Sequence, residues 1–288
     1  MLYQFFVIVF AIAVLCAQKS QAIVNGKELL NSQRPEVVRL ILYKDKDSLL
    51  DQVDNGRCTG TAISDSLVLT AGHCVTGNFN EEKNNTIVLH RFKENKTEEI
   101  ISVLQSYTEF IPEDLQKIKD EQNKHGKTTP GCSPGEKPMV LTKTPDLALL
   151  KFPNKTFRTW AQINFQKIHS AGDSIEFLGY GMTASSFEVS IPFSDPQPND
   201  LRLGKSKIWR TGEKRFAIIS QYLDPIGDIG DSGAPVFDNG QVTAVLSTLE
   251  TKCETEYGED YAIMNTAVAL SSIEAIKFFS KALNKLEN

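Results

Sequence analysis

The chain has 288 residues, of which 41% are hydrophobic and 23% are charged, and its formal net charge is −5. This length and apolar content suit two small domains packed together, each with its own core. An acidic balance without a block of Lys or Arg argues against a nucleic-acid-binding protein.

Residues 1–22 are predicted to be a signal peptide. The stretch 5–17 is apolar but too short to span a bilayer, and Ser20-Gln21-Ala22 places small side chains at the two positions that a signal peptidase inspects. We therefore expect secretion to the extracellular space or the periplasm. No later stretch predicts a membrane span.

The remaining chain is predicted to consist of short strands separated by turns. The strands are expected at residues 37–42, 61–63, 66–70, 146–152, 174–179, 203–208, 216–220, 235–237 and 242–249. Short strands with Gly, Asn and Asp between them are typical of antiparallel barrels. Asp238-Asn239-Gly240 predicts a hairpin between two of them.

Two segments have helical patterns. The first, residues 113–123, is charged and lies in a long stretch, about 107–140, that ends in loop-forming residues. The second begins near Ser271-Ser272 and repeats its apolar residues at helical spacing to the C-terminus.

Three short motifs carry the residues of a nucleophilic site. They are Thr-Ala-Gly-His-Cys at 70–74, Asp-Leu-Ala-Leu-Leu at 146–150 and Gly-Asp-Ser-Gly-Ala-Pro at 230–235. Each alone has a structural explanation, namely a strand end, an apolar strand and a glycine-rich turn. All three together, in this order, favour a catalytic interpretation.

A serine hydroxyl becomes a good nucleophile when an imidazole takes its proton and a buried carboxylate orients that imidazole. Ser232, His73 and Asp146 supply these groups, and their order along the chain is His, Asp, Ser. With its flanking motifs, the chain from Ile23 onward resembles the trypsin/chymotrypsin-like serine endopeptidases.

This resemblance implies an all-β fold of two antiparallel six-stranded β-barrels with the active site between them and a C-terminal helix. Residues 23–156 would form the N-terminal barrel, with the catalytic His and Asp and the insertion at about 107–140. Residues 157–288 would form the C-terminal barrel, which carries the catalytic Ser and ends in the helix. The insertion is either a solvated surface loop or a lid over the cleft.

The resemblance also implies how the site is assembled. Ile23-Val24-Asn25-Gly26 resembles the mature N-terminus of these proteases, whose ammonium group pairs with the aspartate before the nucleophile, here Asp231. Backbone N–H groups of Gly230 and Ser232 would form the oxyanion hole. Ser247 matches the serine whose hydroxyl bonds the catalytic aspartate.

The specificity pocket is expected to include Ile226, Ser247 and Leu249. Ile226 lies six positions before the nucleophile, where an apolar residue favours apolar substrate side chains. Asp224 and Asp228 flank it, so a shift of one position would restore a carboxylate. Leu249 replaces a glycine of the family and would narrow substrate entry.

The chain has five cysteines, and four remain after signal cleavage. The resemblance implies a disulfide between Cys58 and Cys74, beside the histidine. Cys132 and Cys253 are also expected to pair, because an even number of cysteines in a secreted chain suggests full pairing. Two free thiols are the alternative.

No cofactor and no metal site is predicted, and His90, His125 and His169 are interpreted as surface or structural residues. Protein or peptide substrates are the expected partners, together with protein inhibitors, and the chain is expected to be a monomer. The alternative function is a catalytically weak or inactive homologue that acts as a binding module, with Leu249 and the insertion blocking the cleft.

Overall fold

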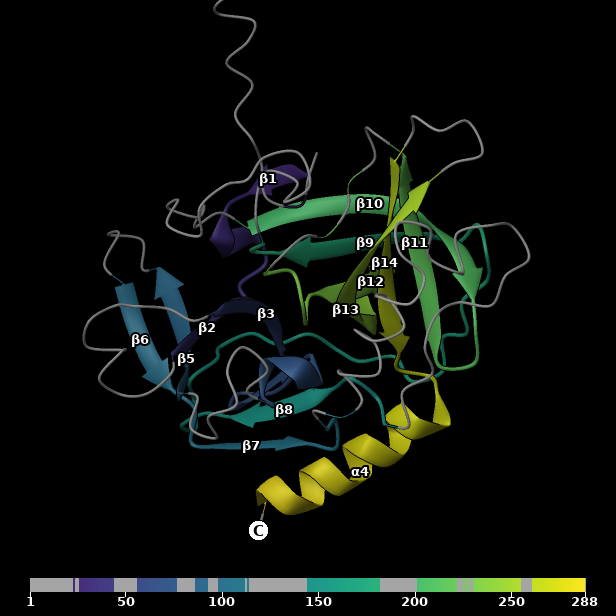
Figure 1. Cartoon of the computed structure of the whole chain (residues 1–288). Coiled ribbons are helices and arrows are strands. Elements are labelled where there is room, and N and C mark those ends of the chain that lie inside the picture. The colour runs from purple at the N-terminus through teal and green to yellow at the C-terminus, as the bar shows by residue number, and fades with distance from the viewer. Residues whose placement is uncertain are drawn as a thin grey trace, which may run out of the picture.

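Two antiparallel β-sheets account for most of the structure, which is a computed structural model of the full chain. It describes residues 23, 26–43, 56–76, 86–92, 98–111, 113, 144–181, 201–221, 225, 227, 230–254 and 261–287. The predicted signal peptide, nearly all of the helix expected at 113–123, Cys132 and Ile226 lie outside these residues. Figure 1 shows the two sheets one above the other, with helix α4 (Ile273–Glu287) along the lower edge.

The C-terminal sheet closes into a barrel. Strand β9 pairs with both β10 and β12, and the order β10-β11-β14-β13-β12 completes the ring, so that six strands surround one core. A short strand, β1 (Lys27–Leu29), extends the sheet at β10. The barrel strands are β9 (Ser174–Gly179), β10 (Leu201–Thr211), β11 (Arg215–Gln221), β12 (Pro235–Asp238), β13 (Gln241–Glu254) and β14 (Tyr261–Ala269).

The N-terminal sheet has seven described strands in the order β6-β5-β2-β3-β4-β8-β7. All seven residues of β2 are buried, including Arg39, and the strand pairs with β3 on one side and β5 on the other. The strands are β2 (Val37–Tyr43), β3 (Gly56–Ala62), β4 (Leu67–Thr70), β5 (Thr86–Phe92), β6 (Glu98–Ser102), β7 (Gln105–Thr108) and β8 (Ala148–Lys151). The 3-10 turn η2 (Gly72–Cys74) follows β4, whereas η1 (Asn31–Gln33) contacts the C-terminal barrel, where Asn31 Oδ1 accepts from the Leu201 N–H at 3.3 Å.

The expected all-β fold with two barrels and a C-terminal helix is confirmed. All nine predicted strands correspond to strands of the structure, with ends that differ by a few residues. The predicted hairpin joins β12 to β13, where Asn239 and Gly240 both have positive φ, as a two-residue turn of this type requires. Strands β1, β5, β6, β7 and β14 were not predicted.

Helix α4 (Ile273–Glu287) joins the two halves of the molecule. The Ser272 hydroxyl accepts a hydrogen bond from the Ala275 N–H at 3.2 Å and so caps the first turn. On the buried face, the Phe278 ring lies 5.8 Å from the ring of Tyr107 on β7, between centroids. Lys281 also forms an ion pair with Glu109 at 2.6 Å. The C-terminal helix therefore packs against the N-terminal sheet as well.

The division of the chain at residues 156/157 stays a prediction. Two features near the start of the described chain belong spatially to the C-terminal barrel: β1 pairs with β10, and Ile23 is buried in that barrel's core.

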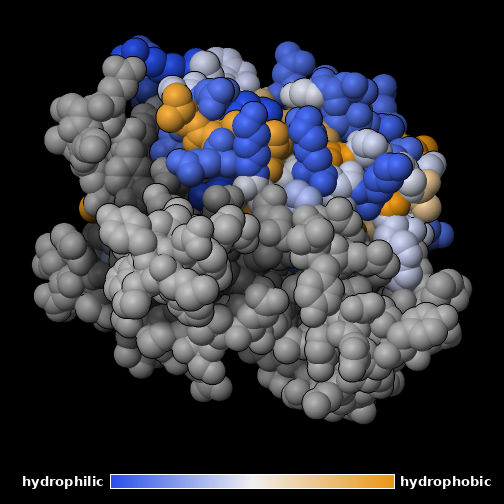
Figure 2. All heavy atoms as spheres, turned by 90° about the horizontal axis from the view of Figure 1, so that it is seen from above, coloured by the Kyte–Doolittle hydropathy of each residue, from blue (hydrophilic) through white to orange (hydrophobic). Residues whose placement is uncertain are grey.

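Within the described residues, no helix is long and apolar enough to cross a membrane. Figure 2 looks down on the end of the molecule that carries β1 and β10, and hydrophilic side chains cover most of the coloured surface there, with smaller apolar areas between them.

Candidate active site

His73 lies in η2, directly after β4. Its backbone N–H donates to Asp146 Oδ1 at 2.7 Å, and its ring Nδ1 lies 2.8 Å from Asp146 Oδ2. The preceding residue must be glycine, because a Cβ on Gly72 would lie 2.6 Å from the Cβ of Phe110 and 3.1 Å from Asp146 Oδ1. The aspartate thus fixes both the backbone and the ring of the histidine.

Asp146 is almost fully buried, with 2% of its surface exposed. The Ser247 hydroxyl on β13 donates to its Oδ2 at 2.5 Å. Burial alone would raise the pKa of this carboxyl, but the charges of His73 and Arg215 and the hydrogen bonds from His73 and Ser247 outweigh it and hold the pKa far below its usual range. Asp146 is therefore ionised wherever the protein is folded near neutral pH.

The predicted disulfide between Cys58 and Cys74 is present and ties β3 to η2. Its Cys74 sulfur lies 3.9 Å from the backbone oxygen of Ser232. Cys58, Cys74 and His73 have ligand atoms within 4.8 Å of one another, a spacing that would suit a metal ion. Because both sulfurs are bonded to each other, this group offers no thiolate to a metal.

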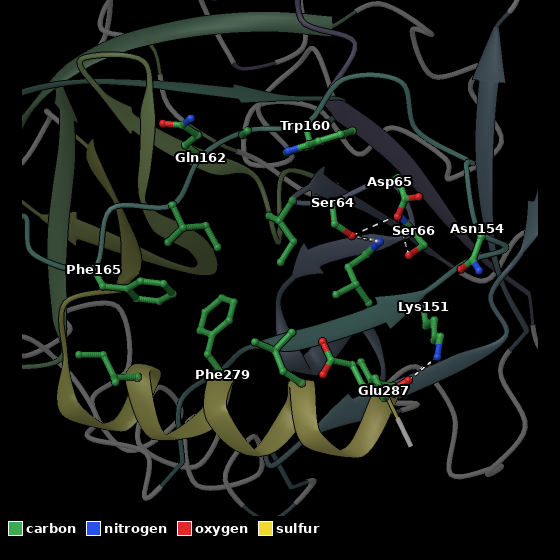
Figure 3. Close-up of a pocket in the computed structure, with 17 residues that line it drawn as sticks. Ser64, Asp65, Ser66, Lys151, Asn154, Trp160, Gln162, Phe165, Phe279 and Glu287 are labelled. Atoms are coloured by element: carbon green, nitrogen blue, oxygen red, sulfur yellow. Dashed lines mark hydrogen bonds between the residues drawn. The ribbon is translucent and has the colours of Figure 1, made fainter.

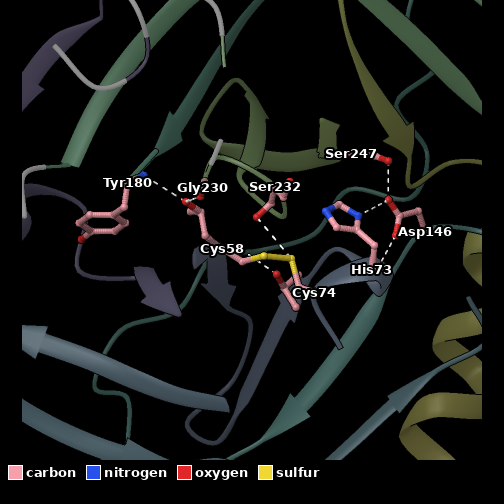
Figure 4. The surroundings of a disulfide bond; sticks show 10 residues. Cys58, His73, Cys74, Asp146, Tyr180, Gly230, Ser232 and Ser247 are labelled. Carbon is pink, nitrogen blue, oxygen red and sulfur yellow. Dashed lines mark hydrogen bonds and ion pairs between the residues drawn. A yellow bond between two sulfur atoms is a disulfide. The ribbon is translucent and has the colours of Figure 1, made fainter. Parts of the chain in front are cut away.

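Ser232 lies in the tight turn that precedes β12, with 8% of its surface exposed. Gly233 has φ +85°, and a Cβ there would lie 2.1 Å from the Thr70 hydroxyl and 2.2 Å from the Thr59 carbonyl oxygen. Its N–H donates to the Leu246 oxygen at 2.7 Å, so the turn is tied to the strand that carries Ser247. Figure 4 shows the His73 ring between Ser232 and Asp146.

Thr59 on β3 holds the turn from the opposite barrel. Its hydroxyl donates to the Gly230 oxygen at 2.9 Å and accepts from the Tyr180 N–H at 3.0 Å, while its own N–H donates to the Ser232 oxygen at 2.8 Å. One residue of the N-terminal sheet thus fixes the carbonyl groups on both sides of Asp231. Sequence analysis did not identify Thr59, although it follows Cys58 directly.

Asp231 is fully buried and accepts a hydrogen bond from the Gly181 N–H at 2.8 Å. A Cβ on Gly179 or Gly181 would lie 1.9 or 2.4 Å from its carboxylate oxygens, so both positions require glycine. Ile23 is fully buried in the core of the same barrel. The pairing of an Ile23 ammonium group with Asp231 stays a prediction.

A family model described as Trypsin matches residues 23–269. The chain belongs to the trypsin family. Solved structures with this fold include neuropsin, a serine protease from mouse brain, with 16% identity, a TM-score of 0.53 and coverage of 92% of this chain and 100% of that one. Human heparin binding protein has 16% identity, a TM-score of 0.54 and coverage of 91% and 96%. A Glu endopeptidase has the same identity and TM-score, with coverage of 89% and 96%. The search of curated proteins found no match.

The expected specificity pocket of this trypsin-family chain is described only in part. The Ser247 hydroxyl donates a hydrogen bond to Asp146, but Ile226 and the side chain of Leu249 lie outside the described residues. The neighbouring Gly227 is held on both its polar atoms by the buried side chain of Asn265, whose Oδ1 accepts from its N–H at 2.6 Å and whose Nδ2 donates to its oxygen at 3.1 Å. Asn265 therefore fixes the backbone of Gly227, five positions before the nucleophile.

The remaining predicted residues lie apart from this site or outside the described part. Cys253 pairs through its backbone with Ala262, but its bridge to Cys132 stays a prediction. His169 is buried against the Phe216 ring, and burial lowers its pKa, which fits the structural role expected of it. His125 and the side chain of His90 are not described.

A pocket lies apart from the candidate active site. This pocket of about 900 Å³ lies between α4, the segment 160–165 and the residues around β4. Figure 3 shows Trp160, Phe165 and Phe279 around it, and the Lys151 ammonium group reaches the Leu286 oxygen at one end. None of the site residues lines this pocket.

Proposed function

We propose that the chain is a secreted serine endopeptidase that hydrolyses peptide bonds through Ser232, His73 and Asp146. The observation that carries this proposal is the buried Asp146 carboxylate in contact with the His73 ring at 2.8 Å, on the side away from Ser232. Membership of the trypsin family and a two-barrel fold support it.

The contacts allow the proton transfers to be derived. An ionised carboxylate only accepts hydrogen bonds, so Nδ1 of His73 carries the proton that lies between it and Asp146. The other nitrogen, Nε2, is then free to take the Ser232 proton as the hydroxyl oxygen attacks the substrate carbonyl carbon. His73 would return that proton to the leaving amine, and a water molecule would hydrolyse the acyl-enzyme by the same route.

Charge develops on the substrate carbonyl oxygen during attack, and we propose that the N–H groups of Gly230 and Ser232 stabilise it. Such donors are worth about 3–4 kcal/mol each where one has been removed. The proposal is supported by the rigid turn around them, in which Gly230 and Gly233 have positive φ and Thr59 holds the Gly230 and Ser232 oxygens.

We also propose that residues 1–22 are removed and that a free Ile23 is needed for activity. The buried Ile23 side chain and the buried Asp231 lie in the same barrel, which would allow the new ammonium group to reach the carboxylate. A chain that starts one residue before Ile23 should fold but hydrolyse little. Full hydrolysis by that longer chain would exclude this activation.

The decisive experiment is labelling with a fluorophosphonate, which reacts with a serine only when a base activates it. Correctly processed protein should be labelled at Ser232, and Ser232→Ala should not. A folded protein that resists the reagent would favour the second candidate, a binding module without activity. Leu249 in place of a family glycine favours that candidate, and one structural relative is named for heparin binding.

A further inference from the structure

A buried guanidinium group lies behind the candidate active site. Arg215, the first residue of β11, has only 6% of its surface exposed. Its Nη1 donates to the Ser247 hydroxyl at 3.2 Å, and that hydroxyl donates to Asp146. A buried cation is costly unless an anion and hydrogen bonds compensate it, so its position at this site requires an explanation.

The direction of these hydrogen bonds is fixed by chemistry. A guanidinium group can only donate and an ionised carboxylate can only accept, whereas a serine hydroxyl has one proton to give. Arg215 donates a hydrogen bond to the Ser247 hydroxyl oxygen, and Asp146 can only accept one. The hydroxyl proton of Ser247 must therefore point to Asp146. The Asp146 oxygen that receives it, Oδ2, is the same atom that faces the His73 ring.

The charges around Asp146 come from two elements. Among the described residues, those that act on its carboxylate are His73 in η2 and Arg215 in β11, and the Ser247 hydroxyl from β13 adds a hydrogen bond. Arg215 holds a permanent positive charge, because guanidinium does not lose its proton in proteins. His73, in contrast, gains and loses its proton during the proposed reaction. Among the described residues that act on this carboxylate, only Arg215 therefore compensates its charge at every step.

We propose that Arg215 is a positioning residue of the triad, which compensates the charge of the buried Asp146 carboxylate and directs the Ser247 hydroxyl proton onto it. This inference rests on the proposed function. Arg215 does not touch the substrate or Ser232 in this role; it acts through Ser247 and Asp146. The positive charge of Arg215 also weakens the attraction between the Asp146 carboxylate and a proton on His73.

The test compares variants of the processed protein that separate charge from hydrogen bonding. Arg215→Met removes both, Arg215→Gln keeps a donor, and Arg215→Lys keeps the charge. Each is assayed by the rate of fluorophosphonate labelling of Ser232 over a range of pH, and by kcat and KM on casein. Arg39→Met, which removes an equally buried arginine from β2, controls for loss of a buried cation.

We expect Arg215→Met to slow labelling about tenfold or more per folded molecule. On casein, the loss should appear mainly in kcat and not in KM. The acid limb of its pH profile should move toward neutral pH, because Asp146 then stabilises a protonated His73 more strongly. Arg215→Gln should show the same shift of the acid limb, and Arg215→Lys should restore the wild-type limb. Arg39→Met should leave the limb in place.

A double-mutant cycle tests whether Arg215 acts through Ser247. In a Ser247→Ala background, Arg215→Met should cost about threefold or less, because the hydrogen-bond chain is already broken. Should Arg215→Met fail to fold, the acid limbs of the pH profiles of Arg215→Gln and Arg215→Lys still show whether the charge of Arg215 acts on the site. Wild-type rates and limbs in the folded Arg215 variants would overturn the positioning role alone. An unreactive wild-type protein would overturn the proposed function and this inference with it.

Discussion

The two halves of the candidate site are held in place by different means. His73 and Asp146 depend on side chains, with a buried carboxylate that contacts a ring nitrogen, a backbone N–H and a hydroxyl. The turn with Ser232 depends on the backbone, where glycines at positive φ and hydrogen bonds to carbonyl oxygens fix the conformation. We infer that charge changes should damage the first half and added bulk the second.

The largest effect is expected from Ser232→Ala, which removes the nucleophile and leaves both kinds of support intact. Turnover should fall by about 10⁶-fold, to the level left by substrate binding and the backbone donors. The midpoint of thermal unfolding should change little, since the hydroxyl takes part in the reaction and not in the packing of the core. Casein hydrolysis measures the turnover, and thermal unfolding measures the midpoint. Retained turnover in Ser232→Ala would mean that another residue carries the reaction.

Asp146→Asn should disrupt the first half, because it replaces the carboxylate by a neutral amide of nearly the same shape. Its amide can donate to the His73 ring and so favour the wrong tautomer, and kcat should fall about 10⁴-fold. Stability should also change with pH. The pKa of Asp146 is lower in the folded protein than its usual 3.8, so the stabilisation is present above that value and is lost as pH falls toward the folded value.

The measurement is urea unfolding of wild type and Asp146→Asn over a range of acid pH. The wild-type free energy of unfolding should decline more steeply below about pH 4 than that of the variant. The same slope in both proteins would show that Asp146 does not carry this pH dependence.

Two glycines test the second half by added bulk. Gly233 and Gly240 both have positive φ, but a Cβ on Gly233 would lie 2.1 Å from the Thr70 hydroxyl, whereas one on Gly240 would meet nothing within 4 Å. Gly240→Ala should cost only the left-handed strain, about 1–2 kcal/mol. Gly233→Ala should cost more than about 3 kcal/mol, because backbone must move. Equal losses in chemical unfolding would contradict the steric account.

The fold was predictable because short-range patterns carry it. Alternation and turn residues located nine strands, and the Asn239-Gly240 turn follows from the two residues themselves. The Cys58–Cys74 bridge followed from the family resemblance. Strands β5 and β6 were missed because polar and charged residues interrupt their apolar pattern, and β14 because no motif drew attention to it.

The supports of the site could not be predicted in the same way, because their contacts join distant parts of the chain. Thr59 and Gly230 are 171 positions apart, and Arg215 and Ser247 come from different strands. A basic residue at the start of a strand normally indicates a solvated end, so Arg215 gave no signal of burial. The pairing of β1 with β10 is likewise a long-range contact that local patterns do not contain.

Thr59 supports the Ser232 turn through its side chain, although that turn otherwise depends on backbone contacts. Thr59→Val has nearly the same shape but leaves the Gly230 oxygen and the Tyr180 N–H without their partner. An unpaired buried polar group costs about 1–3 kcal/mol, part of which should appear as a looser turn.

We expect kcat of Thr59→Val to fall about tenfold with little change in KM, since the turn carries the N–H groups proposed to stabilise the oxyanion. Thr59→Ser should restore most of the rate because it returns the hydroxyl. Thr61→Val, two residues along the same strand, controls for loss of a buried threonine hydroxyl. If Thr59→Val and Thr61→Val lose stability alike and both keep the wild-type kcat, the turn is held by its backbone alone.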